Sequence, residues 1–206
     1  MSTVSGKGNE RACCRNWSEY PSIRDVIVRI REMDAFCFGS LQPEDWGTVE
    51  GWLAIAEKNP HMNVCMEVDG VIMGSVHWLW LNRAARDRLL TGHLRDGQIR
   101  PEDTVGKPPL TEPVYLYLLS MMVHPECQGH GYLRKLWNHA VMEQAEWRKQ
   151  GVVFEEALAT AWSDAGRAIL TSAGGVAVGT DGQGHGLLQL PVPVRKLLVK
   201  ADPKTN

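Results

Sequence analysis

The sequence predicts an α/β fold with a mixed sheet, on three observations. The apolar periodicity alternates between that of helices and that of strands along the chain. An Asp69-Gly70 pair joins two β-prone runs, and a glycine-rich turn links a buried strand to a long helix. The predicted order is two helices, two strands, an insertion, and then strand, helix, strand, helix and two strands. A further strand near the N-terminus is left open.

The N-terminal part of the chain carries the signals of two helices and a hairpin. Apolar residues recur at spacings of three and four over residues 23–33, which indicates one face of a helix. Residues 42–60 predict a second helix, which Asn59-Pro60 would end. Two β-prone runs flank Asp69-Gly70, and this dipeptide favours the tight turn of a β-hairpin.

Residues 82–113 form a long connection between two predicted strands. Its first half suits a short amphipathic helix, and its second half, with four prolines, suits a loop. Long connections inside compact domains are often lids or binding loops. Two interpretations therefore stay open, a lid over a binding site and a solvated loop.

The C-terminal part alternates strands and helices. Residues 114–123 predict a buried strand, and residues 129–150 a helix with one apolar face. A strand over residues 152–162 and a short helix over residues 163–175, which Ser163 would cap, come next. Residues 176–192 predict two strands around a glycine-rich turn.

Composition limits the classes of protein to consider. The chain has 206 residues, a formal net charge of -2 and 44% apolar residues, which suits one domain without a basic nucleic-acid footprint. The longest apolar run is about ten residues, whereas a membrane span needs about 20. Five cysteines without a CxxC spacing indicate free thiols in a reducing compartment and no metal site. We expect a cytoplasmic protein with a disordered tail at 1–12 and a single domain at 13–206.

The tetrapeptide QGHG occurs twice, at residues 128–131 and 183–186. The first copy joins a strand to a helix, whose N-terminal turn has unpaired N–H groups and a partial positive charge. Gly129 and Gly131 would let a phosphate approach those groups closely. The second copy joins two strands, where glycines are most simply turn residues. An anion site is therefore expected at the first copy only.

The stretch around the first copy resembles the acyl-CoA signature of the GNAT superfamily of N-acetyltransferases. That signature is V-x-P-x-x-[RQ]-G-x-G-x-[GA] between a strand and a helix, and the matching residues are Val123, Pro125, Gln128, Gly129 and Gly131. Leu133 departs from it, since the family usually has Gly or Ala there. The order of elements is also similar. The resemblance implies a mostly antiparallel mixed sheet flanked by helices, with the fourth and fifth strands splayed apart.

The resemblance also implies that acetyl-CoA is the co-substrate, with no metal required. The pantetheine arm would pair with the backbone of Met121, Met122 and Val123. The N–H group of Met122 or Met121 would polarise the thioester carbonyl, and such a donor typically lowers the barrier by ~3 kcal/mol. The pyrophosphate would lie on the N–H groups of six residues: Gln128, Gly129, His130, Gly131, Tyr132 and Leu133.

The general base is left open by the sequence. Many members of the family place a Glu on the fourth strand, upstream of the signature valine. The corresponding positions carry Tyr117 and Tyr115, and tyrosine is a poor base near neutral pH because its pKa is ~10. Other candidate bases lie on or beside the neighbouring strands: Glu112, Glu67 and His77.

The acceptor site is the least defined part of the prediction. Trp78 and Trp80 alternate with His77 and Leu79, so they form either part of a Trp-rich core or an aromatic wall of the acceptor site. The expected function is transfer of an acetyl group from acetyl-CoA to an amine of a small molecule or peptide, by direct attack in a ternary complex. The alternatives are transfer of a longer acyl chain and a non-catalytic acyl-CoA sensor. Neither nucleic acid nor membrane is an expected partner, and a homodimer is left open.

Overall fold

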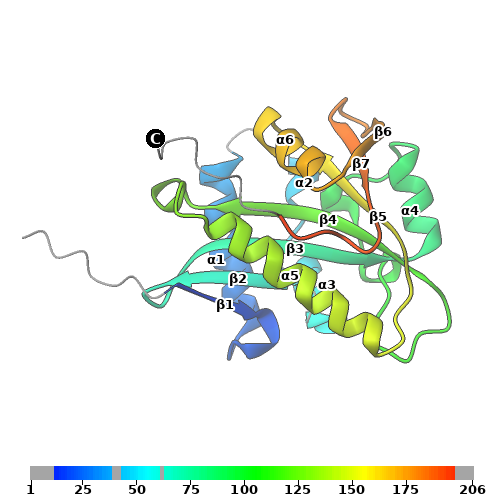
Figure 1. Ribbon diagram of the computed structural model, residues 1–206. Coiled ribbons are helices and arrows are strands. Elements are labelled where there is room, and N and C mark those ends of the chain that lie inside the picture. The colour runs from blue at the N-terminus through cyan, green and yellow to red at the C-terminus, as the bar shows by residue number, and fades with distance from the viewer. Residues whose placement is uncertain (1–11, 39–42, 61–62, 198–206) are drawn as a thin grey trace, which may run out of the picture.

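The computed structural model describes residues 12–38, 43–60 and 63–197. A seven-stranded sheet forms its centre, in the order β1-β2-β3-β4-β5-β7-β6 (Figure 1). Among the strands of the described residues, only β4 and β5 pair in parallel, so the expected mixed and mostly antiparallel sheet is confirmed. The strands are β1 (Ala12–Asn16), β2 (Asn63–Val68), β3 (Val71–Leu81), β4 (Val114–Val123), β5 (Phe154–Ala161), β6 (Val176–Thr180) and β7 (Gly186–Leu190).

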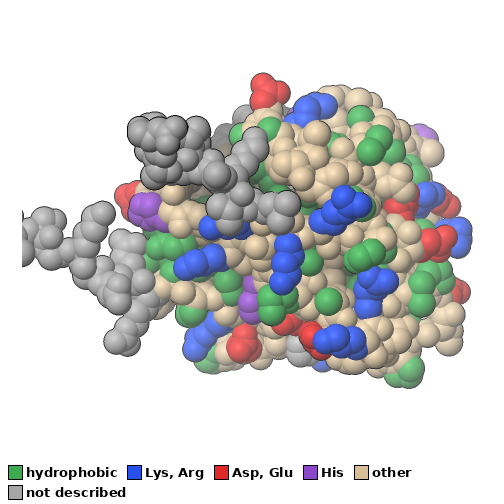
Figure 2. All heavy atoms as spheres, in the orientation of Figure 1, with side chains coloured by type: hydrophobic (Ala, Val, Ile, Leu, Met, Phe, Trp, Pro, Cys, Tyr) green, Lys and Arg blue, Asp and Glu red, His purple; other side chains and the backbone are tan. Residues whose placement is uncertain are grey.

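Helices cover both faces of the sheet. They are α1 (Ile23–Cys37), α2 (Pro43–Trp46), α3 (Val49–Lys58), α4 (Arg83–Leu90), α5 (Tyr132–Lys149) and α6 (Asp164–Ser172). In Figure 1, α5 crosses the front face of the sheet, and α1 and α3 lie behind it. Charged side chains of both signs are interspersed over the front face (Figure 2). Within the described ranges, no helix combines the length and the apolarity needed to cross a bilayer.

Most of the predicted elements are confirmed, but the helix expected over residues 42–60 is wrong. The chain forms α2 and α3 instead, because Gly47 takes a positive φ of 59° between them. Thr48 then caps α3, its Oγ1 accepting the N–H of Gly51 at 3.0 Å. The strand left open near the N-terminus is present as β1, so Ala12 belongs to the sheet. The rest of the expected tail lies outside the described residues.

Side chains of β3 alternate between two different environments. Trp78 and Trp80 are each 1% exposed and pack in the core beneath α5. Trp78 lies 5.8 Å from the Trp137 ring, which belongs to that helix. His77 and Leu79 point to the opposite face. The Trp-rich core is therefore correct for Trp78 and Trp80, and the idea that they form a wall of the acceptor site is wrong.

The insertion at 82–113 is packed against the domain over its first half. Leu89, Leu94 and Ile99 are almost fully buried and share a core cluster with Tyr115 and Tyr117 of β4. Two 3-10 turns, Asp96–Gln98 and Pro101–Asp103, follow α4. The first half of the insertion therefore supplies core side chains, whereas residues 105–113 are half-buried or exposed.

Candidate active site

The fourth and fifth strands separate halfway along β4. Their parallel pairing runs from Val114 to Leu118 of β4, whereas β4 stays paired with β3 as far as Val123. The register of β3 and β4 shifts between His77 and Trp78, which leaves Leu119 as an extra residue in β4. Such bulges bend a strand and interrupt its pairing. Beyond Leu118, one edge of β4 therefore faces the gap that opens beside β5.

The hydrogen-bond register decides which backbone groups of β4 face this gap. The N–H of His124 donates to the carbonyl of Met73 at 2.8 Å, so His124 forms a hydrogen-bonded pair with its neighbour. Hydrogen-bonded and non-hydrogen-bonded pairs alternate along an antiparallel ladder. Met122 therefore directs its backbone groups to β3, while Met121 and Val123 direct theirs toward the gap. Of the two donors left open by the sequence, this register favours Met121.

The first QGHG turn connects this edge to the N-terminus of α5. Gly129 and Gly131 have φ values of 84° and 73°, and Gly131 is the N-cap residue of a helix that has no side-chain cap. A Cβ on Gly129 would meet no atom within 4 Å, and one on Gly131 would meet only Arg134 Nη2 at 3.5 Å. Gln128 donates from Nε2 to the carbonyl of Val123 at 3.3 Å. The turn thus holds open the space before the first N–H groups of α5.

The other residues of the predicted phosphate site lie in the first turn of α5 or just before it. His130 is exposed, and its ring contacts that of Tyr132 at 5.5 Å. Tyr132 is buried as the first residue of α5. Leu133, which departs from the family pattern, packs its side chain against the core beneath the helix. Its bulk is therefore directed away from the open space.

A cleft lies on the opposite face of the sheet from α5 and reaches the bulge of β4. Its empty space, including the part open to solvent, is ≈ 800 Å³. Leu119 and Ser120 both line it, because the bulge turns two consecutive side chains to one face. The described residues line it with the rings of Trp17, Phe38, Trp46, Trp52 and Trp162, besides that of His77. Its carboxyl groups come from Asp34, Asp45 and Asp96.

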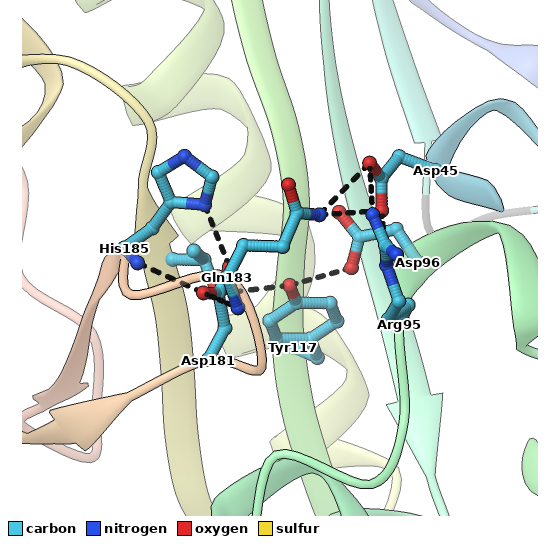
Figure 3. A network of polar contacts seen from close by, with 8 residues as sticks. Asp45, Arg95, Asp96, Tyr117, Asp181, Gln183 and His185 are labelled. Carbon is cyan, nitrogen blue, oxygen red and sulfur yellow. Dashed lines mark hydrogen bonds and ion pairs between the residues drawn. The ribbon is translucent and has the colours of Figure 1, made fainter. Parts of the chain in front are cut away.

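A polar network joins the insertion, α2 and the second QGHG turn at the edge of this cleft (Figure 3). Asp45 accepts two hydrogen bonds from Arg95, at 3.0 Å to Nε and 2.9 Å to Nη2. Gln183 donates to the same carboxylate at 2.8 Å. Asp96 accepts the O–H of Tyr117 at 2.7 Å on Oδ1 and forms no salt bridge with any described residue. Asp45 thus forms a salt bridge with Arg95, whereas Asp96 feels the charge of Arg95 without a salt bridge to it.

Two carboxyl groups of the cleft have pKa values near neutrality. Burial raises the pKa of Asp96 to about 7, and the nearby carboxylates of Asp45 and Asp181 raise it further against the opposing hydrogen bond from Tyr117. Burial also raises the pKa of Asp34 to about 7, although the charge of Arg31 opposes the rise. A group with such a pKa can accept a proton at neutral pH and release it again. Both are therefore candidate general bases.

The candidate bases chosen from the sequence lie in different places relative to the cleft. His77 lines the cleft with Nδ1 at 3.1 Å from Ser120 Oγ, and burial lowers its pKa to about 3, so its ring is neutral. Burial raises the pKa of Tyr117 well above 10, and its hydroxyl lies behind Asp96 as a donor. Glu112 is exposed in the loop before β4 and does not line the cleft.

The sequence pattern does not single out Asp96 or Asp34. Asp96 precedes Gly97, a pair typical of an ordinary turn, and Asp34 lies in a helix where a polar residue usually faces solvent. No local sequence signal could have identified Asp96, because it reaches Tyr117 only through the tertiary packing of the insertion.

The second QGHG copy is confirmed as a turn between β6 and β7. Asp181 accepts the backbone N–H groups of Gln183 and His185, both at 2.8 Å, and its Oδ2 lies 2.9 Å from His185 Nδ1. The side chain of Gln183 reaches Asp45, as described above. The second copy therefore also contributes a side chain to the polar network of the cleft.

Comparisons with known proteins agree with this geometry. The model of the Acetyltransferase (GNAT) family matches residues 27–156, which is more than half of the chain. No curated protein matches the sequence. Among solved structures, FeeM, an N-acyl amino acid synthase from uncultured soil microbes, has a TM-score of 0.58 at 10% identity and covers 90% of this chain and 93% of its own.

Two further solved structures show the same fold. The loading GNATL domain of CurA from Lyngbya majuscula has a TM-score of 0.56 at 13% identity, covering 88% of this chain and 98% of its own. The yncA protein of Salmonella typhimurium, whose structure contains its cofactor acetyl-CoA, has a TM-score of 0.54 at 16% identity, with 95% and 99% covered. The matched family model, the open glycine turn and the separated strands lead to one conclusion: this chain belongs to the GNAT acetyltransferase family.

Proposed function

We propose that this protein transfers an acetyl group from acetyl-CoA to an amine acceptor, by direct attack of the amine with both substrates bound. One observation carries the proposal: β4 separates from β5 beside a glycine turn that leaves the N-terminus of α5 open. The similar yncA structure contains acetyl-CoA, and the similar NatC complex, with a TM-score of 0.53, contains CoA and a Gag peptide.

The residues present fit a CoA thioester. The edge of β4 beyond Leu118 offers the backbone groups of Met121 and Val123 to an extended pantetheine arm. The N–H groups of residues 128–133 suit a pyrophosphate, because no side chain caps the helix and Gly129 leaves the approach free. The N–H of Met121 would donate to the thioester oxygen, a contribution of ~3 kcal/mol in comparable enzymes.

The amine must lose a proton before it attacks. Asp96 fits this task because its pKa of about 7 matches neutral pH, even with the opposing charge of Arg95, and because it forms no salt bridge with a described residue. Tyr117 holds Oδ1 of Asp96 at 2.7 Å, which leaves Oδ2 for the amine. Tyr117 therefore acts as a positioning residue, and His77 and Glu112 are not required as bases.

The test is amine-dependent release of thiol from acetyl-CoA, measured with a panel of small-molecule and peptide amines. We expect release with at least one amine and tight binding of CoA in calorimetry. The variant Gly131→Glu places a carboxylate before α5 and should abolish binding of CoA while the circular dichroism spectrum stays unchanged. Unaltered affinity in the folded variant would contradict the proposed site.

The same assay separates the alternative functions. Replacing acetyl-CoA by hexanoyl-CoA and octanoyl-CoA tests the length of the acyl chain, and faster release with these thioesters would favour a longer-chain transferase. Tight CoA binding without thiol release for any amine would favour an acyl-CoA sensor.

A further inference from the structure

The cleft contains buried polar atoms that lack a partner. His77 and Asn63 are 6% and 4% exposed, and both line the cleft. Within the described part of the chain, His77 Nε2 and Asn63 Oδ1 form no hydrogen bond. The register pairs Asn63 with His77 and His77 with Ser120, so the three residues form a row across β2, β3 and β4. Buried polar groups are normally satisfied, and this row therefore points to a bound ligand.

The two unpartnered atoms of this row can accept hydrogen bonds, whereas the third such atom among the residues of the cleft, the donor Trp17 Nε1, lies beside the buried Cys65 thiol. Asn63 Oδ1 accepts only, and His77 Nε2 also accepts when the ring donates its Nδ1–H to Ser120. Asp96 binds Tyr117 through Oδ1, and among the described residues it forms no salt bridge, although the charge of Arg95 acts on it. These acceptors complement an ammonium group, which has three N–H donors and no acceptor.

The cation that lines the cleft, Arg31, is already engaged. Its Nη1 donates to the carbonyl groups of Trp46 and Gly47, both at 2.9 Å, and its guanidinium lies 5.4 Å from the Trp46 ring. Arg95 pairs with Asp45. Asp34 and Asp96 consequently give the cleft its negative charge once they are ionised.

The remaining walls of the cleft are apolar and aromatic. Trp17 meets the His77 ring edge-on at 5.0 Å, and Trp162 stacks on His185 at 4.1 Å between ring centroids. These ring contacts hold both indole side chains in place. Rigid indoles cover aromatic rings and attract cations to their faces. A cleft that is open to solvent on one side and lined mainly by apolar and aromatic side chains suits a small ligand with an aromatic ring.

We propose that the acceptor is a primary arylalkylamine, bound as a cation with its ammonium toward Asp96 and the Asn63–His77 row and its ring among the indoles. This inference rests on the proposed acetyl transfer. The ammonium gives one proton to Asp96, and its nitrogen then bonds to the acetyl carbon while the carbon–sulfur bond breaks. A second proton leaves the nitrogen and ends on the sulfur of CoA, and Asp96 releases its proton to solvent.

The first test measures binding without any acyl-CoA, by calorimetry at pH 8, with three probes. 2-Phenylethylamine carries ring and charge, 2-phenylethanol carries the ring alone, and spermidine carries charge without a ring. We expect 2-phenylethylamine to bind at least tenfold more tightly than either of the others. Equal affinity for the alcohol, or tighter binding of spermidine, would overturn the inference.

A matched pair of variants tests whether the Asp96 carboxylate binds the ammonium group. Asp96→Asn keeps an acceptor for the hydroxyl of Tyr117. It should weaken the binding of 2-phenylethylamine at least tenfold and leave the affinity for 2-phenylethanol unchanged within twofold. Asp103→Asn is the control, because Asp103 is also a buried carboxylate of the insertion, pairs with Arg88 at 2.9 Å and lies outside the cleft. It should leave both affinities unchanged. Equal weakening in the two variants would contradict the role of Asp96.

Turnover then separates this inference from the proposed function. If 2-phenylethylamine binds as expected but acetyl-CoA releases no thiol, the acceptor class stands and acetyl transfer is wrong. If thiol is released with spermidine or peptide amines and not with 2-phenylethylamine, acetyl transfer stands and the acceptor class is wrong.

Discussion

The two QGHG turns have the same sequence and the same conformation at their first glycine, but they differ in what faces their N–H groups. Gly129 and Gly184 have φ values of 84° and 88°, and a Cβ on either would meet no atom within 4 Å. In the second turn, the chain supplies the anion itself, because the carboxylate of Asp181 accepts two backbone N–H groups. In the first turn, no side chain caps the N-terminus of α5. The tetrapeptide therefore fixes the conformation of its first glycine only, since Gly131 caps α5 in a left-handed conformation whereas Gly186 begins β7, and the neighbouring residues decide whether an anion is supplied from within the chain.

The largest expected effect concerns the carboxyl groups buried near the second turn. Asp96 faces Tyr117, Asp45, Asp181 and Arg95, and its folded pKa of about 7 lies above the ordinary value of ~3.9. The folded state therefore binds this proton more tightly than the unfolded state. The free energy of unfolding should fall as pH rises from ~4 to ~7, by at most ~1.4 kcal/mol per pH unit from this group.

Denaturant unfolding of the wild type and Asp96→Asn across this pH range measures that contribution. The variant should lose one such slope, while Asp34 keeps its own, because burial also raises the pKa of Asp34 to about 7. Parallel pH profiles for the two proteins would show that Asp96 titrates normally and is a poor candidate for the base.

The next largest effect is expected on stability when the Asp181 carboxylate is removed from the second turn. Asp181→Ala leaves the N–H groups of Gln183 and His185 without their acceptor and should lower the free energy of unfolding by about 1–3 kcal/mol. Calorimetry should find the CoA affinity of this variant within twofold of the wild type. A large loss of CoA affinity would mean that the two turns form one composite site.

The smallest effect isolates the side chain that links the second turn to the cleft. Gln183→Ala removes the hydrogen bonds to Asp45 but leaves the Arg95 pair in place. A hydrogen bond to a charged group contributes about 1.5–3 kcal/mol, but Gln183 reaches the amine site only through Asp45. The KM for the amine should therefore rise by about tenfold or less, which is ~1.4 kcal/mol, without a change in the KM for acetyl-CoA. An unchanged KM for both substrates would mean that the second QGHG copy is only a turn and has no role in binding the amine.

The sequence predicts the fold well wherever local signals decide the structure. Asp69 and Gly70 take φ values of 50° and 83°, as the hairpin requires, and the apolar periodicity finds α1 and α5. The break at Gly47 is not predictable in this way, because helical spacing continues on both sides of it. The starting residue of α5 also depends on the glycine turn that precedes it.

The candidate site is predictable on its CoA side and not on its acceptor side. The signature from Val123 to Gly131 is contiguous, so its residues are found together in the sequence. The cleft is built from residues far apart in the chain, such as Asp34, His77 and Asp96. Period-two alternation separates Trp78 from His77 but does not say which face carries a cleft. Only the packing of the insertion and α1 answers that question.

The most direct test of the difference between the two turns is calorimetric titration of CoA into Gly129→Glu and Gly184→Glu. Both substitutions place the same side chain at a positive φ in open space, so both carry a similar backbone strain. Gly129→Glu should weaken CoA at least a hundredfold, because its carboxylate lies before the N-terminus of α5, and Gly184→Glu should leave the affinity within twofold. Equal affinities in the two folded variants would contradict the account, since the first turn would then have no role in binding CoA.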